Sequence, residues 1–344
     1  MPLLTDHSAI PRPGVAQWFQ LALGLVLGGV FLALVFSAVD LASVSAQLAR
    51  AAWWPLLVAL LAYAVDFVLR ALRFWFLLTD DDRRDLPFTP TIAPFIASFG
   101  ISDILPFRLG DAFRVYWFHR QFRLAVGRVI GAMIIERVLD MVSILALASI
   151  ALLAVDTRLP RAVILQFQLV LTAAWIIGGL TLLSPAILER LAAWGQARFD
   201  RPAAQKLAGM ARSIAASIRS VGQVRRMAGL IAFSIAIWLL ESLVMLGAWV
   251  SLGGAPGEWL RPFLAFTVST LGTLVPALPG HFGSYEYFGM LSFRAVGVGA
   301  TMAAAVIMIA HLILWLPTAL FGIGWLMLSR RNGRNSVKTE PSQA

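Results

Sequence analysis

The chain has no cysteine and little charge. Its 344 residues contain no Cys, four His and 13% charged residues. Disulfides, thiolate nucleophiles and Cys-ligated metals are therefore excluded, and the four histidines lack metal-ligand spacing. The sequence also lacks a phosphate-binding loop, a zinc-protease motif and a nucleophile elbow. We therefore expect that the protein is not an enzyme, that it binds no cofactor or metal, and that it does not hydrolyse ATP. A serine hydrolase using Ser284 with His281 or His311 is a weak alternative.

Hydrophobic residues dominate what is present. They make up 59% of the chain, and the mean hydropathy is +0.80. Average soluble domains are roughly 45–50% apolar and about 25% charged. The net charge of +10 could suggest a nucleic-acid partner, but Lys and Arg also gather on the cytoplasmic loops of membrane proteins. We therefore predict an all-α integral membrane protein, with membrane lipids and no nucleic acid as partners.

Six apolar stretches have the length of a bilayer-spanning helix, which is about 20 residues. Together they predict a single polytopic membrane domain over 1–344, with spans at 18–37, 54–78, 126–155, 162–184, 228–252 and 298–328. The first stretch exceeds the apolar core of a signal peptide, so we expect a retained helix and treat a cleaved signal as the alternative. An interfacial amphipathic helix is expected over 41–52, with Trp53 and Trp54 at the headgroup level.

A Leu-Pro-x-x-x-Gly pattern occurs twice, beginning at Leu105 and at Leu278. Each copy interrupts an apolar stretch, 91–120 or 263–296, whose arms are too short to cross a bilayer. Backbone freed by Pro and Gly is tolerated at membrane depth only where protein or water satisfies it. We predict two re-entrant helical hairpins. Broken segments at matching positions of two halves indicate a substrate site in transporters.

Arginine-rich loops set the predicted orientation. The basic amphipathic segment 186–227 and the disordered tail 329–344 should be cytoplasmic. With six spans, we expect both termini on the cytoplasmic side of a bacterial-type plasma (inner) membrane. The two hairpins then enter from opposite sides, which predicts an inverted-topology repeat of 54–155 and 228–328.

Charged side chains within the apolar stretches carry the functional signal, because each costs at least about 2.5–3.5 kcal/mol on insertion scales. The spacings of Asp66, Arg70 and Arg73 place all three on one helix face. Two other readings stay open. The charges could be an internally paired network that fixes helix register, or Arg70 and Arg73 could reach the membrane interface. About one arginine is left for an anion when Arg70, Arg73, Arg108, Arg114 and Arg137 are set against the carboxylates of Asp66, Asp111, Glu136 and Asp140.

The motif from Leu105 to Arg114, followed by Glu136-Arg137-Val-Leu-Asp140, resembles the transmembrane (flippase-domain) family of lysylphosphatidylglycerol synthase. Its pattern reads roughly Leu-Pro-x-Arg-x-Gly-Glu-x-x-Arg, then Glu-Arg-x-x-Asp. The segment 69–74 resembles its Arg-rich second span, and 279–286 resembles its Pro-Gly-Gly-x-Gly-x-x-Glu signature. Asp111 replaces a Glu of that pattern, and His281 replaces a Gly.

The resemblance implies lipid translocation between leaflets. The stretch after Leu328 leaves no room for an aminoacyltransferase, so a stand-alone membrane member is expected. We expect a lipid flippase, or a transporter of a lipid-linked or amphiphilic substrate with a polar or anionic headgroup. A secondary transporter of a small soluble anion, and a non-transporting subunit of an envelope-lipid or glycan enzyme, are the alternatives. An envelope-lipid-modifying enzyme is accordingly a candidate partner.

The predicted transport site combines the buried charges with the second hairpin. It comprises Asp66, Arg70, Arg73, Arg108, Asp111, Arg114, Glu136, Arg137, Asp140, Pro279, Gly280, His281, Gly283 and Glu286. The arginines would contact an anion, with Asp111, Glu136 and Asp140 orienting them, and Glu286 would pair with an Arg or a cationic headgroup. Transport would run downhill or be coupled to a gradient, with candidate proton carriers Asp66, Glu136, Asp140, Glu241 and His281.

Overall fold

The protein is a bundle of helices, as the composition predicts. A computed structural model describes residues 15–79, 86–198, 202–220 and 224–337, and these contain no β-strand. Five helices are long and apolar enough to cross a membrane: α3 (Trp53–Leu78), α6 (Val126–Ala154), α7 (Arg161–Leu183), α10 (Val224–Ser251) and α13 (Ala300–Val337). The predicted all-α membrane fold is confirmed.

A sixth crossing is formed by α1 (Val15–Ser37) if it is counted together with α2 (Leu41–Leu48), which bends away from it by 83°. Asp40 caps α2, and its carboxylate accepts hydrogen bonds from the hydroxyl and N–H of Ser43 and the N–H of Ala42. These bonds, led by that of the Ser43 hydroxyl, lower the pKa of Asp40. The short helix predicted over 41–52 is therefore present, and it is shorter than expected.

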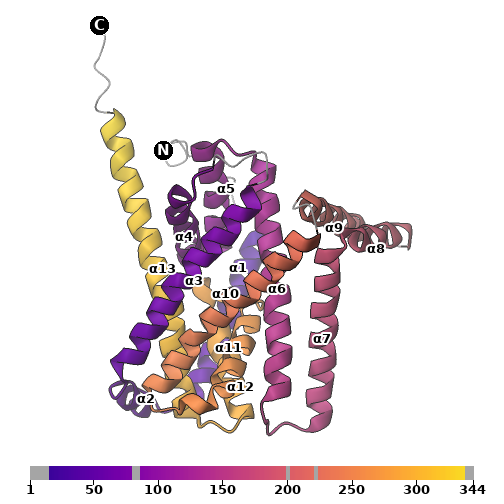
Figure 1. Cartoon of the computed structure of the whole chain (residues 1–344). Coiled ribbons are helices and arrows are strands. Elements are labelled where there is room, and N and C mark those ends of the chain that lie inside the picture. The colour runs from indigo at the N-terminus through magenta and orange to yellow at the C-terminus, as the bar shows by residue number, and fades with distance from the viewer. Residues whose placement is uncertain (1–14, 80–85, 199–201, 221–223, 338–344) are drawn as a thin grey trace.

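Two helix pairs turn back in the middle of the bundle (Figure 1). In the first pair, α4 (Thr89–Ile104) is joined to α5 (Leu109–Phe122) by η2 (Pro106–Arg108). In the second, α11 (Leu260–Gly272) leads through η4 (Pro279–His281) to α12 (Ser284–Ala295). The first pair opens toward the end of the bundle where α1 starts, and the second opens toward the opposite end. Both lie where the sequence predicts hairpins.

The turns of these pairs hold backbone in the left-handed region. Phe107 has φ 63° and Arg108 has φ 51°, while Gly280, His281 and Gly283 have φ of 72°, 63° and 95°. Such values are uncommon for residues other than glycine and persist only where the surroundings impose them. We call η2 the first turn and η4 the second turn.

The segment predicted as one basic amphipathic element forms two helices, α8 (Pro185–Arg198) and α9 (Pro202–Ser220). They pack together and project sideways from the end of α7 (Figure 1). Arg219 forms an ion pair with Glu189, and that hydrogen bond lowers the pKa of the Glu189 carboxyl. Pro at the start of each helix explains the division, because proline is favoured in the first turn and unfavourable in the interior.

The last helix, α13, runs on to Val337. The tail predicted as disordered from residue 329 is therefore helical through Val337. Extending a helix that is already formed has no new nucleation cost. The polar residues that follow the apolar span can therefore continue its helix. Residues 338–344 of that tail, like the N-terminal residues 1–14, lie outside the described residues.

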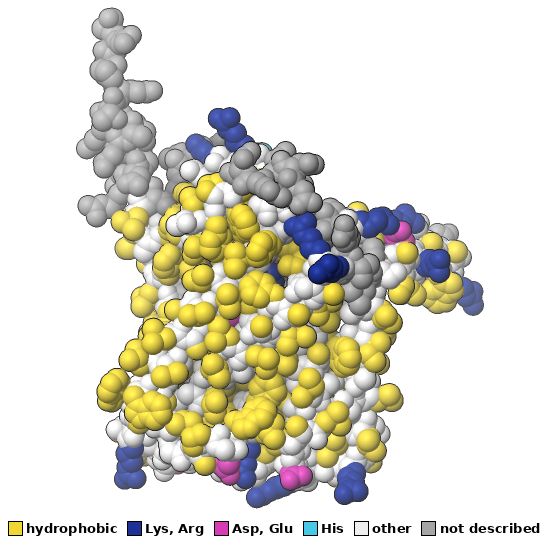
Figure 2. Space-filling model, viewed as in Figure 1, with side chains coloured by type: hydrophobic (Ala, Val, Ile, Leu, Met, Phe, Trp, Pro, Cys, Tyr) yellow, Lys and Arg dark blue, Asp and Glu magenta, His cyan; other side chains and the backbone are white. Residues whose placement is uncertain are grey.

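The outer surface is apolar around the middle of the bundle. Figure 2 shows a broad yellow band between basic side chains at one end and mixed charges at the other. Exposed apolar side chains on the long helices include Leu61 of α3, Leu169 and Val170 of α7 and Leu320 of α13. A belt of this kind suits the hydrocarbon region of a bilayer, because no soluble monomer exposes so large a contiguous apolar surface.

Candidate functional site

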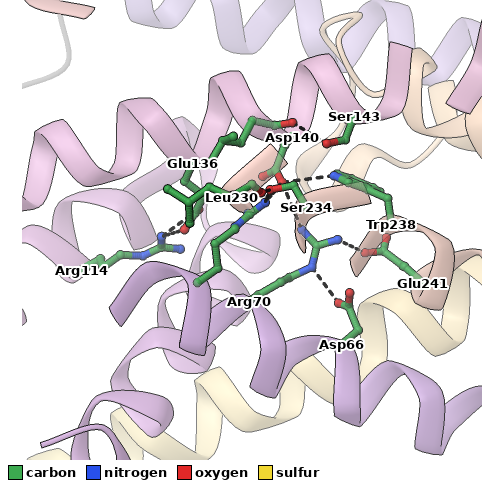
Figure 3. Close-up of polar contacts among 12 residues, drawn as sticks. Asp66, Arg70, Arg114, Glu136, Asp140, Ser143, Leu230, Ser234, Trp238 and Glu241 are labelled. Atoms are coloured by element: carbon green, nitrogen blue, oxygen red, sulfur yellow. Dashed lines mark hydrogen bonds and ion pairs between the residues drawn. The ribbon is translucent and has the colours of Figure 1, made fainter. Parts of the chain in front are cut away.

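A group of five charged residues lies buried between α3, α6 and α10, and we call it the central cluster (Figure 3). Its members are Asp66, Arg70, Arg73, Asp140 and Glu241. The Arg70 guanidinium lies 2.7 Å from Asp66 and 3.8 Å from Asp140, and it also pairs with Glu241. Arg73 lies 2.7 Å from Asp140. The spacing of four and three along α3 places all three α3 side chains in the same network, as expected.

The helix α10 supplies one face of the central cluster. Ser234 accepts a hydrogen bond from Arg73 at 2.8 Å. The indole N–H of Trp238 donates to Asp140 at 3.1 Å, and its ring lies under Arg70 at 4.5 Å. Ser234, Trp238 and Glu241 share one helix face. Our site prediction missed this face, although a lone Glu in a long apolar run is the signal that could have found it.

Burial decides between the readings of Arg70 and Arg73. Arg70 is 5% exposed and Arg73 is 0% exposed, so neither side chain reaches the membrane interface. Instead, two guanidiniums face three carboxylates. Removing one member of such a group leaves a buried charge without its partner, which is strongly destabilising. Each arginine of the central cluster therefore has a carboxylate partner within the cluster, although Nε and Nη2 of Arg73 and Oδ1 of Asp66 are buried without a hydrogen-bond partner.

Arg114 is held equally firmly. Its guanidinium lies 3.1 Å from Glu136 and donates to the Ser98 hydroxyl at 2.8 Å. The rings of Phe74, Phe95 and Phe99 surround it at 4.5 to 5.1 Å. With both charged side chains only 1% exposed, Arg114 is enclosed by cation–π contacts and its ion pair. The prediction that Arg114 contacts an anion receives no geometric support.

The first turn presents the two more accessible arginines of the first half. Arg137 lies 3.4 Å from Asp111, and its side chain is 38% exposed. Arg108 is exposed, and among the described residues it has no carboxylate within 4.0 Å. Arg108 is thus the member of this pair without an ion pair, and Asp111 contacts Arg137; their predicted roles toward an anion stay predictions.

The second turn is held by a histidine rather than an arginine. Glu286 caps α12 by accepting the Gly283 N–H at 2.7 Å, and its other oxygen lies 2.5 Å from Nδ1 of His311. Nε2 of His311 lies 2.9 Å from the Gly280 carbonyl oxygen. Glu286 pairs here with His311 of α13 rather than with an Arg, and its contact with a cationic headgroup stays a prediction. His311 was noted as an intramembrane histidine but left out of the predicted site.

The two turns meet near the middle of the bundle. Helix α4 packs against η4, and α13 joins them: Thr318 donates to the Asp103 carboxylate at 3.0 Å, while Trp315 packs on Phe282. His281 is half-buried and lies close enough to Arg108 and Arg137 to interact with both electrostatically. Pro279 begins η4. Arg108 and Arg137 thus supply the positive charge of this region, and the half-buried His281 lies beside them.

The hydrolase alternative has no support from the second turn. The Ser284 hydroxyl donates to the backbone carbonyl of His281, and the side chain is 0% exposed. A nucleophilic serine needs an imidazole in hydrogen-bond reach of its hydroxyl. Within the described part of the chain, no group of three His, Asp or Glu could hold a metal ion.

Fold and site together define a polytopic helical membrane protein with a paired internal charge network and two bent helix pairs. The chain belongs to the family described as the lysylphosphatidylglycerol synthase TM region, which it matches over residues 21–322. The expected family membership is confirmed.

Two relatives are similar over most of the chain. "Glycosyltransferase AglD" of Haloferax volcanii is 26% identical across 92% of this chain, and the match spans 55% of that protein. "UPF0104 membrane protein MJ1078" of Methanocaldococcus jannaschii is 23% identical across 70% of this chain and 98% of its own length. The chain therefore corresponds to about half of the first relative and to nearly all of the second.

Proposed function

We propose that this protein moves a lipid, or a lipid-linked amphiphile, with an anionic headgroup between the leaflets of a membrane. The observation that carries this proposal is Arg108, an exposed arginine with no carboxylate within 4.0 Å among the described residues, in the turn of one of two helix pairs that open toward opposite ends of the bundle. Arginine binds phosphate and carboxylate groups through its planar fork of donors. A headgroup could therefore replace the missing counter-ion.

The bent pairs supply the path in this proposal. Taken as re-entrant hairpins, α4–α5 and α11–α12 interrupt the bilayer from opposite sides and bring polar backbone to mid-depth, where only protein or a water-filled cavity satisfies it. Arg137 lies near Arg108 and adds a second positive charge to this region, and the neutral His281 offers a polar ring beside them. The central cluster and the Arg114–Glu136 pair then hold the surrounding helices in register.

The protein acts here as a transporter rather than an enzyme. Membership of a family named for the membrane region of a synthase supports a non-catalytic membrane role. We place it in the inner membrane of a bacterial-type cell, with both termini cytoplasmic, because the basic end of the bundle in Figure 2 is the end that carries α8 and α9.

A second candidate follows from the length of one relative. The protein named as a glycosyltransferase is nearly twice as long as the region matched by this chain. The chain could therefore serve as the membrane partner of a separate enzyme that transfers sugars to lipid. Co-purification of such an enzyme with a chain that moves no lipid would favour this candidate.

Reconstitution tests the leading proposal. The purified protein is placed in liposomes, and movement of fluorescent lipids between leaflets is followed by chemical quenching from outside. We expect faster exchange of an anionic phospholipid than in protein-free liposomes. Equal exchange in both preparations, with folded protein present, would reject the proposal.

A further inference from the structure

His311 bridges two acceptor groups inside the bundle. Nε2 lies 2.9 Å from the carbonyl oxygen of Gly280, and Nδ1 lies 2.5 Å from a carboxylate oxygen of Glu286. The side chains of His311 and Glu286 are 7% and 8% exposed. Neither contact belongs to the arginine network described above.

The chemistry of these contacts requires a proton between His311 and Glu286. A backbone carbonyl only accepts, so Nε2 must carry the hydrogen in the contact with Gly280. Nδ1 then bears either a second hydrogen facing a carboxylate or a lone pair facing a carboxylic acid. With no proton there, a lone pair and a carboxylate would face each other in a buried site, which is costly. In both allowed forms the pair holds one proton.

The same contacts fix the second turn. Gly280, in the left-handed region at φ 72°, is held through its carbonyl, and Gly283 at φ 95° is held through the other Glu286 oxygen. The rings of Phe282 and Tyr285 each lie 4.6 Å from the His311 ring. One side chain of α13 therefore fastens both η4 and the start of α12.

We infer that His311 is the positioning residue of the second turn, and that a proton shared with Glu286 is the ligand that keeps this turn latched to α13. Loss of this proton releases the turn. As regulation of a transport path this inference rests on the proposed function, but the latch itself can be measured without transport.

The other ionisable groups around this pair have partners of their own or stand further away. Within the described residues, no other charged group lies within 4.0 Å of Glu286 or His311. The facing groups from the packed elements are Tyr63 of α3, Asp103 of α4, Glu241 of α10, His281 of η4 and Tyr285 of α12. Asp103 is engaged by Thr318, and the Tyr63 hydroxyl donates to the Leu314 carbonyl.

We call the His311 contacts with Glu286 and Gly280 the latch. Glu286→Gln removes the shared proton but keeps the hydrogen bonds of the latch. The glutamine amide N–H can donate to Nδ1 of a neutral His311, and its oxygen can still accept the Gly283 N–H. Both hydrogen bonds remain, but the shared proton is gone. His311→Phe keeps a ring between Phe282 and Tyr285 and removes both hydrogen bonds.

A buried serine beside the latch reports its opening. Ser284 is 0% exposed at the start of α12, and Ser149 of α6 is 3% exposed and not in contact with the latch. Because the chain has no cysteine, Ser284→Cys and Ser149→Cys each create a single thiol. The ratio of their labelling rates in the reconstituted full-length protein removes the pH dependence of the reagent that both thiols share, and the same ratio measured with Glu286→Gln corrects for the pH dependence of each thiol itself.

We expect this ratio to rise about tenfold or more as the pH is raised and the shared proton is lost, because a hydrogen bond to a charged group is lost with it. With Glu286→Gln it stays low at every pH, and with His311→Phe it is high at every pH. A ratio independent of pH in the parent protein, or a Glu286→Gln ratio as high as that of His311→Phe, overturns the inference. The parent and Glu286→Gln comparison decides the question even if His311→Phe does not fold. Absence of lipid movement alongside an intact latch would reject only the proposed function.

Discussion

At the residue scale, the buried arginines differ in what neutralises them. Arg70, Arg73 and Arg114 are buried, and each forms an ion pair with at least one carboxylate. Arg108 is exposed without such a partner, and Arg137 is partly exposed with a longer contact to Asp111. A ligand that carries negative charge would gain most at Arg108, because no existing ion pair has to be broken there.

Arg108→Gln should therefore reduce lipid movement about 10- to 100-fold while leaving the thermal unfolding midpoint unchanged, since it removes a charge-assisted hydrogen bond to the headgroup. Arg123→Gln is the matched control. Arg123 is also exposed with positive φ, but it ends α5 at the far side from the turn. Equal loss in both variants would mean that Arg108 is not a headgroup contact.

Arg137→Lys separates charge from geometry at the same site. Lysine retains the charge but loses the planar fork that binds an anion through two donors. We expect a fall in transport with little change in stability, because the Arg137 side chain is already 38% exposed. Normal transport by both Arg137→Lys and Asp111→Asn in folded protein would assign these residues a structural role only.

Arg114→Met should act on stability instead. It leaves the Glu136 carboxylate buried without its partner, which costs about 3–5 kcal/mol. Arg114→Met combined with Glu136→Gln should recover part of that loss, because no buried charge then remains unpaired. Thermal unfolding in detergent measures both effects. A single variant as stable as the parent would contradict the buried ion pair.

At the element scale, close backbone contact joins α1 to the second turn. A Cβ at Gly28 would lie 2.8 Å from the Leu278 backbone nitrogen, whereas one at Gly29 would meet nothing within 4 Å. Small residues that let backbones approach are typical of helix contacts in membranes. Gly28 therefore leaves no room for a side chain, whereas Gly29 of the same helix does.

Gly28→Ala should lower stability by about 1–3 kcal/mol through overpacking against the second turn. Gly29→Ala should be neutral or slightly stabilising, because alanine favours helix over glycine. Unfolding midpoints of the two variants, measured side by side, check this. Similar behaviour of both would show that α1 does not pack closely against η4.

The elements were largely predictable, whereas their pairings were not. The lengths of the apolar runs and the two Leu-Pro-x-x-x-Gly patterns located the long apolar helices and both bent pairs. Both signals can be read from a short stretch of sequence, because bilayer thickness fixes the length of a spanning run and proline interrupts a helix where it stands. Helical spacing also grouped Asp66, Arg70 and Arg73. The pairing of Glu286 with His311, and of Glu241 with Arg70, depends on how α12, α13, α10 and α3 pack. No local pattern encodes such contacts.

At the scale of the whole molecule, the bundle has a basic end that carries α8 and α9 and an opposite end that carries the α10–α11 connection (Figures 1 and 2). Basic residues favour the cytoplasmic side of a membrane. The two bent pairs open toward these opposite ends, which is the arrangement predicted for an inverted repeat of 54–155 and 228–328.

Single cysteines should report this orientation. Ala193 of α8 and Gly257 of the α10–α11 connection are both exposed. In intact cells we expect a membrane-impermeant reagent to label Gly257→Cys and to label Ala193→Cys only after permeabilisation. The reverse pattern would place α8 and α9 outside the cell and contradict the predicted topology.

The central claim is that the meeting point of the two turns passes an anionic headgroup, and its most direct measurement is lipid exchange in liposomes of the purified protein. Matched fluorescent phospholipids with anionic and zwitterionic headgroups are compared in the same preparation. We predict faster exchange of the anionic lipid, reduced about 10- to 100-fold by Arg108→Gln and preserved by Arg123→Gln. Folded protein that exchanges neither lipid faster than protein-free liposomes would contradict the account.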